Sequence, residues 1–147
     1  MKLLALLLTL CLCAETFSQS CDEANSLVSV RKRKTNRTEY VIFTLKNPVT
    51  STTTIIDAQP PFVQDGSGVT VQISGCKYKQ VVFKNIVWTC KTNIIPGSTY
   101  LIRQIKSTGQ LEGVISYVIG YRCAALHVTN YEYQDGDYKK VVVRVKY

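Results

Sequence analysis

The segment Tyr138–Tyr147, YKKVVVRVKY, alternates apolar and basic side chains with the period of a β-strand. The valines at every second position from Val141 to Val145 fall on one face, whereas Arg144 and Lys146 fall on the other. Such alternation is typical of a strand with one buried face and one solvated face. The segment therefore predicts a sheet with a buried side.

Segments rich in Val, Ile, Tyr and Thr recur along the rest of the chain, separated by turn signals such as Asn47-Pro48, Asp65-Gly66, Ser107–Gly109 and Asp135-Gly136. The predicted strands are Leu27–Arg31, Glu39–Lys46, Thr53–Asp57, Val69–Ser74, Gln80–Thr89, Tyr100–Lys106, Val114–Arg122, Ala125–Glu132 and Tyr138–Tyr147. No window of helical length keeps a period of about 3.6 residues. Eight or nine short strands at this spacing predict an all-β fold, an antiparallel β-sandwich.

The N-terminus has the order of a secretory signal peptide. Lys2 supplies a positive charge, and the apolar run Leu3–Ala14 is shorter than the roughly 20 residues that cross a bilayer. Small residues permit cleavage before Gln19 or before Cys21. We expect residues 1–18 to be removed and residues 19–147 to form a single secreted domain without a transmembrane segment.

Cysteine usage agrees with an extracellular location. Removal of residues 1–18 leaves Cys21, Cys76, Cys90 and Cys123, which predicts two disulfides with three possible pairings. The closest two, Cys76 and Cys90, are fourteen residues apart, too far for the paired ligands of a zinc site. We therefore expect disulfides and no metal.

Cys76, Trp88 and Tyr121-Arg122-Cys123 together resemble the pattern of an immunoglobulin domain. In that family a disulfide ties the two sheets, a tryptophan packs on it, and a tyrosine lies two residues before the second cysteine. The resemblance covers the half of the chain from Cys76 to Tyr147 and implies that Cys76 and Cys123 bridge the sheets. Cys90 and the long segment before Cys76 depart from the family pattern.

Positive charge is the strongest functional signal. The mature chain keeps 17 basic and 9 acidic residues, a net charge of +8. Five basic residues within seven positions, Arg31, Lys32, Arg33, Lys34 and Arg37, predict a site for a polyanion. The only sequon, Asn36-Arg37-Thr38, lies within this cluster and predicts glycosylation of Asn36 on an exposed loop.

Catalytic patterns are scarce. His127 is the only histidine, which excludes two-histidine mechanisms, and no serine lies in a Gly-x-Ser-x-Gly elbow. Glu132, Asp135 and Asp137 do not have the spacing of a calcium loop. We therefore expect no catalytic residue, no metal and no cofactor.

These features favour a secreted binding protein that engages an extracellular protein, or a sulfated glycan or other cell-surface polyanion, through loops and basic faces. Nucleic acid is not an expected partner of an exported chain. Two further functions stay open at this point. One is that of a small secreted hydrolase or toxin-like protein that acts on membranes or glycans. The second is that of a small-ligand carrier with a β-barrel cavity lined by Phe43, Phe62, Phe83 and Trp88.

Overall fold

The computed structural model describes residues 23–90, 97–125 and 127–147, and these residues form strands and connecting loops without a helix. The strands are β1 (Ser26–Thr35), β2 (Thr38–Lys46), β3 (Thr52–Ala58), β4 (Phe62–Val63), β5 (Thr70–Val71), β6 (Lys77–Lys84), β7 (Trp88–Thr89), β8 (Ile102–Leu111), β9 (Val114–Tyr121), β10 (His127–Asp135) and β11 (Tyr138–Lys146). The prediction of an all-β chain is confirmed.

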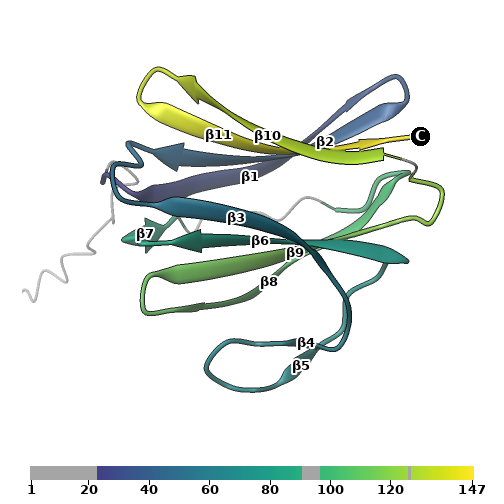
Figure 1. The fold of residues 1–147 in the computed structure, drawn as a ribbon, viewed down its shortest axis with the longest axis horizontal. Helices are drawn as coiled ribbons and strands as arrows, with labels where there is room; N and C mark the ends of the chain where they lie inside the picture. Colours follow the sequence, from purple (N-terminus) through teal and green to yellow (C-terminus); the bar gives the residue numbers. More distant parts are fainter. Residues whose placement is uncertain (1–22, 91–96, 126) are drawn as a thin grey trace, which may run out of the picture.

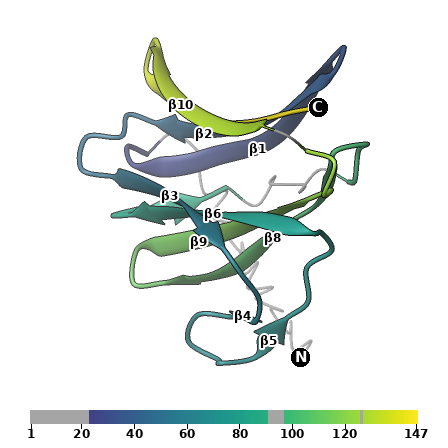
Figure 2. The same ribbon diagram turned by 45° about the vertical axis from the view of Figure 1, so that its right-hand side comes forward.

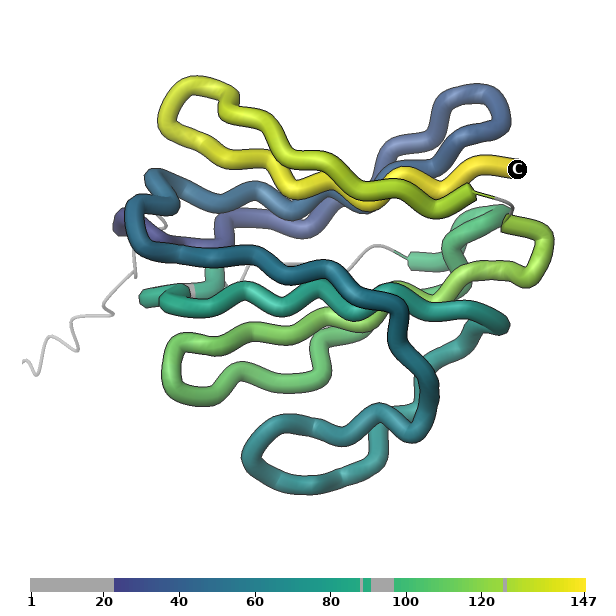
Figure 3. Tube along the Cα trace, in the orientation of Figure 1, coloured from purple at the N-terminus to yellow at the C-terminus, as the bar shows by residue number. Residues whose placement is uncertain are grey.

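The strands form two main sheets that stack as two layers (Figures 1 and 2). The five-stranded sheet has the order β10-β11-β2-β1-β7, and the four-stranded sheet has the order β3-β6-β9-β8. Neighbouring strands are antiparallel, except that β7 pairs in parallel with β1 through Ser26↔Trp88 and Leu27↔Thr89. The chain crosses between the layers after β2, on either side of β7 and after β9, as the tube helps to follow (Figure 3).

The inner faces of the two sheets share one hydrophobic core. From the five-stranded sheet, the alternating residues of β2 and β11 point inward, and Phe43 has no exposed surface. Its ring lies 5.2 Å from the ring of Phe83 and 5.3 Å from that of Tyr117, both on the four-stranded sheet. Burying a side chain of this size contributes about 1.5–3 kcal/mol. The alternation in the sequence therefore identifies the core-facing residues correctly.

Tyr117 makes the stability of this core depend on pH. It is 3% exposed, and burial raises its pKa to about 12. An unfolded tyrosine loses its proton near pH 10, so between these two values the folded protein binds more protons than the unfolded chain. The free energy of unfolding should therefore fall as pH rises from 10 to 12.

The Tyr117→Phe variant should escape this alkaline loss. At pH 8 its free energy of unfolding should differ little from wild type, whereas at pH 11 it should retain about 1.4 kcal/mol that wild type loses. Urea unfolding at the two pH values measures the difference. Tyr131→Phe, at an exposed tyrosine, is the control and should follow wild type. An equal alkaline loss in Tyr117→Phe would contradict the assignment.

A small hairpin covers the outer face of the four-stranded sheet. β4 and β5 pair with each other below that sheet (Figure 2), and Phe62 and Ile73 pack there against Tyr78 and Val118. The ring of Phe62 meets that of Tyr78 edge-on, with 4.9 Å between the centroids. Gly120 allows this approach, because a Cβ atom there would collide with the carbonyl oxygen of Ser74.

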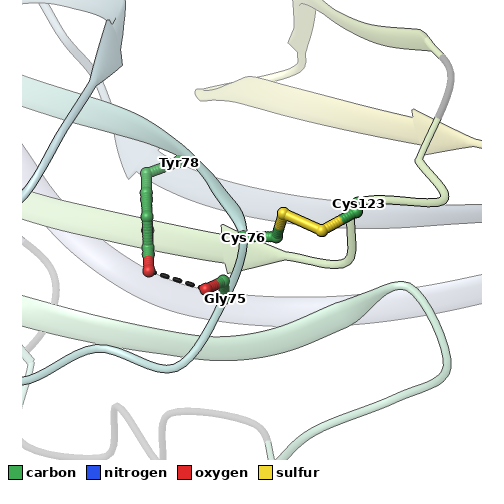
Figure 4. The surroundings of a disulfide bond; sticks show 4 residues. All are labelled: Gly75, Cys76, Tyr78 and Cys123. Carbon is green, nitrogen blue, oxygen red and sulfur yellow. Dashed lines mark hydrogen bonds between the residues drawn. A yellow bond between two sulfur atoms is a disulfide. The ribbon is translucent and has the colours of Figure 1, made fainter.

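Cys76 and Cys123 form a disulfide with their Cα atoms 5.2 Å apart (Figure 4). Cys76 precedes β6 and Cys123 follows β9, and these strands are neighbours in the four-stranded sheet. The expectation that this disulfide bridges the two sheets is therefore wrong, and the immunoglobulin resemblance loses its main feature. The two cysteines meet because β6 and β9 pair antiparallel, with Lys77 opposite Tyr121.

Cys90 is buried and also disulfide-bonded. Cys21 lies outside the described residues, as do residues 1–18, so the second pairing and the signal peptide stay predictions.

One predicted turn and two predicted strands differ from the structure. The predicted strand Gln80–Thr89 is divided between β6, which ends at Lys84, and β7 in the other main sheet. Ser107–Gly109 has the composition of a turn, but these residues lie inside β8 at a register shift. Gly109 has a φ of 138°, and a Cβ atom there would lie 2.9 Å from Cβ of Asp65. Gly109 therefore serves a β-bulge beside the β4–β5 hairpin. Of the predicted strand Val69–Ser74, only Thr70–Val71 is a strand.

Candidate binding face

The basic run Arg31–Lys34 lies within β1 and is therefore part of a sheet, not of a loop. Successive side chains of a strand point to opposite faces. Arg31 and Arg33 lie on the outer face, because their partners are Ile42 and Tyr40, which alternate with the core residues of β2. Lys32 and Lys34 lie on the opposite side. The structure thus divides the predicted cluster between two surfaces.

Pairing across four strands builds three rows on the outer face of the five-stranded sheet. Directly opposite residues share a face, so each row runs across β1, β2, β11 and β10. The rows are Arg33, Tyr40, Arg144 and Thr129; Arg31, Ile42, Val142 and Tyr131; and Ser29, Thr44, Lys140 and Tyr133. Four cations and three tyrosines from distant parts of the chain are therefore neighbours.

This outer face is hollowed. A hollow of about 400 Å³ and another of about 190 Å³ lie along it, and both are lined by Ile42 and Tyr133. In the ribbon the β1–β2 and β10–β11 hairpins rise on either side of this face (Figures 1 and 2). We call the two hollows together the outer groove. Arg31 lines the larger hollow and Arg33 the smaller one.

The four cations of this outer face differ in how they are held. Lys140 donates to Oγ1 of Thr44 at 3.2 Å and lies 4.0 Å from the carboxylate of Asp135. Nε of Arg144 donates to Oγ1 of Thr129 at 3.1 Å. Arg31 and Arg33 are exposed. Neither forms an ion pair with another residue in the described part of the chain. These two guanidinium groups are therefore available to an anion.

Two tyrosines line the outer groove on the side of β10, across from the arginines of β1. Tyr131 and Tyr133 are 43% and 46% exposed, and their rings stack with 6.3 Å between centroids. Both lie on β10 two residues apart, so that the strand period puts them on one face. Tyrosine combines a large apolar area with a polar tip, which is typical of recognition surfaces.

The inner side of the β1–β2 hairpin has a structural role. Nζ of Lys32 is buried, and this burial lowers the pKa of Lys32. The negative charge of Glu39 acts in the opposite direction and raises that pKa. Glu39 is 2% exposed, and its Oε2 accepts hydrogen bonds from the backbone N–H groups of Leu101 at 3.0 Å and Ile102 at 2.9 Å. The hydroxyl of Thr99 donates to the same oxygen. Glu39 thus fastens residues 99–102 to β2.

The remaining predicted cations lie near the tip of this hairpin. Lys34 and Arg37 are exposed and line a hollow of about 250 Å³ with Tyr100 and Tyr147. Asn36 occupies the two-residue turn with a φ of 43° and is exposed. An oligosaccharyltransferase would find this side chain accessible. Glycosylation of Asn36 stays a prediction.

Residues that could carry catalysis are dispersed. His127 begins β10, is exposed and lies opposite Lys146. Among the described residues, no group of three or more His, Cys, Asp and Glu side chains is placed to hold a metal ion. In the same part of the chain, no helix is long and apolar enough to span a membrane.

No protein family model, curated protein or solved structure matches this chain.

Proposed function

We propose that this chain is a secreted, non-enzymatic β-sandwich protein that binds an extracellular polyanion in its outer groove. The observation that carries the proposal is the pair of exposed guanidinium groups, Arg31 and Arg33, beside Lys140 and Arg144 on one hollowed face. The leader-like N-terminus and the disulfide support secretion.

The two outer faces of the molecule differ in a way that supports binding. On the four-stranded sheet the outer face is covered by the β4–β5 hairpin and is apolar where Phe62 meets Tyr78. On the five-stranded sheet no described element covers the outer face, which carries arginine and tyrosine side chains. A solvated face without a function would favour small polar and Lys residues over this composition.

The chemistry of the outer groove fits sulfate or another oxyanion on an extended chain. A guanidinium group donates two parallel hydrogen bonds to such an anion, and this bond is stronger than one between neutral groups. Arg31 and Arg33 are two residues apart on β1, so their anchor points are about 7 Å apart. Two further cations, Lys140 and Arg144, lie on β11, about 10 Å from β1, which is two strand spacings. A sulfated glycan laid across the strands would meet the cations of both β1 and β11.

A protein partner is the second candidate for the same face. The observation in its favour is the apolar strip of Ile42 and Val142 between the tyrosines and the arginines. Apolar centres with Tyr and Arg around them are typical of protein interfaces. A protein with an acidic surface would use the same cations, and the experiment below separates the two partners.

A ligand carrier and a hydrolase have less support from the side-chain packing. A small-ligand carrier needs an open interior, but Phe43 and Phe83 pack on each other in the core and Phe62 packs in the separate cluster under β4 and β5. Nothing is described of the side chain of Trp88. A hydrolase needs an acid and a base near a nucleophile, and His127 lies exposed at the start of an edge strand.

Replacing Arg31 and Arg33 by serine should weaken binding to heparin more than the lost charge requires. Each contact between a cation and an anionic group contributes about one to the slope of log affinity against log salt concentration. The loss of two such contacts should therefore reduce the magnitude of this slope by about 2. The matched control is Lys77→Ser with Lys84→Ser, which removes two exposed cations from the four-stranded sheet. Elution salt from heparin is compared with elution from a sulfonate ion exchanger for each variant.

The elution of these variants shows whether heparin binds in the outer groove or elsewhere on the protein. The proposal requires the variant without the two arginines to elute from heparin at a lower salt concentration than the variant without the two lysines. On the ion exchanger, the elution of both variants should shift equally from that of wild type. Equal shifts on both columns would contradict a polyanion site in the outer groove and leave the protein-partner hypothesis. A larger effect of Lys34→Ser with Arg37→Ser would move the site to the hairpin tip, where removal of a glycan from Asn36 should strengthen binding.

A further inference from the structure

A nine-residue strand lies open at one edge of the five-stranded sheet. β10 pairs with β11 on one side, and no strand in the described ranges pairs with its other side. Its register is continuous from His127 to Asp135, whereas β8, an edge strand of the other sheet, has two register shifts. Proteins usually protect open edges with bulges, Pro or Lys. β10 contains none of these.

The open side of β10 presents the backbone groups of its even-numbered residues. A two-residue turn joins β10 to β11, and its closing pair, Asp135 and Tyr138, is of the hydrogen-bonded kind. The two kinds of pair then alternate, so odd-numbered residues of β10 bond to β11. The 2.7 Å bond from Asn47 N–H to the carbonyl of Asp137 agrees, because it directs odd residues of β11 toward β2. The open backbone groups belong to Val128, Asn130, Glu132 and Gln134.

This strand is complementary to an antiparallel copy of itself. When the copy is centred on Tyr131, Asn130 lies opposite Glu132 and Val128 lies opposite Gln134, so open groups meet open groups. At the ends, His127 lies opposite Asp135. No like charges face one another in this register, and Glu132 is also neutralised by Lys139 of its own chain at 2.5 Å. Opposite charges and polar pairs across strands stabilise pairing.

We infer that two copies of this protein associate edge to edge through β10, around a two-fold axis at Tyr131. Each hydrogen-bonded pair exchanges two bonds, which gives about eight bonds between the chains. Because opposite residues share a face, the two five-stranded sheets become one continuous sheet. The two outer grooves then lie on the same side. The association needs no bound anion, so its test is independent of the proposed function.

A cysteine at the axis tests the register. In the paired strands residue 131 faces its own copy at a non-hydrogen-bonded position, where Cα atoms are about 4.5 Å apart and within reach of a disulfide. Tyr133→Cys is the matched control, because both tyrosines are similarly exposed on the same face. Its copy would lie about 13 Å away along the strands, too far for a disulfide. Under mild oxidation, Tyr131→Cys should form a covalent dimer roughly tenfold faster than Tyr133→Cys.

The unmodified protein gives a second test. Its mass in sedimentation equilibrium should rise toward twice that of one chain as concentration increases. Asn130→Pro should stay monomeric while it keeps the wild-type circular dichroism spectrum, because the N–H it removes points to the open edge. Equal cross-linking rates of the two cysteine variants, or a single-chain mass of the wild type at every concentration, would overturn the inference.

Discussion

Replacement of both Cys76 and Cys123 by serine is expected to lower the free energy of unfolding by about 4 kcal/mol. The bond joins positions 47 residues apart, and closing a loop of this length restricts the unfolded chain. Both cysteines are exposed, so the serines leave no cavity in the core and the loss reports the missing covalent link. Urea unfolding of the double variant against wild type measures this loss.

Chemical reduction cannot replace this double variant as a test, because it would also open the bond of Cys90. The single variants Cys76→Ser and Cys123→Ser are useful companions: each should lose as much stability as the double variant and expose one alkylatable thiol. An unchanged urea midpoint in the double variant would show that the unfolded chain is already restricted at this loop.

Glu39→Ala is the second substitution expected to have a large effect, a loss of about 3–5 kcal/mol. It removes the oxygen that accepts from the N–H groups of Leu101 and Ile102 and from the hydroxyl of Thr99. It also removes the negative charge near the covered ammonium of Lys32. A buried donor without a partner costs about 1–3 kcal/mol.

Glu39→Gln separates the two contributions, because the amide keeps an acceptor oxygen and loses only the charge. We expect its stability to lie between wild type and Glu39→Ala in urea unfolding. Glu23→Ala makes the same change at an exposed position and should have little effect. If Glu39→Ala proved no more destabilising than Glu23→Ala, Glu39 would not fasten residues 99–102 to β2.

Side-chain alternation predicts the strands of the core well, because burial of one face leaves a local mark in the sequence. The pattern of Glu39–Lys46 predicts a strand with Val41, Phe43 and Leu45 inward, and all three are fully buried in β2. Turn residues are less informative. Ser107–Gly109 has the composition of a turn, but the approach of Asp65, which makes a bulge there, depends on a contact that is distant in sequence.

The candidate site is predictable only in part. The basic run is evident in the sequence. If a strand includes Arg31 and Arg33, the alternation of side chains places both on one face of the sheet. The neighbours of these arginines cannot be predicted, because the sequence does not say that β2 lies between β1 and β11. Tyr131 and Tyr133 are recognisable as tyrosines near a turn, but their place opposite the arginines is set by strand order.

The bond between Cys76 and Cys123 also makes the chain from β6 to β9 a closed covalent ring. Three strands of this ring belong to the four-stranded sheet, whereas β7 belongs to the five-stranded sheet, so the ring passes through both layers. A single peptide cut within residues 77–122 would therefore open the ring without dividing the molecule. A protease that cuts there produces two fragments, which migrate together in gel electrophoresis until the disulfide is reduced.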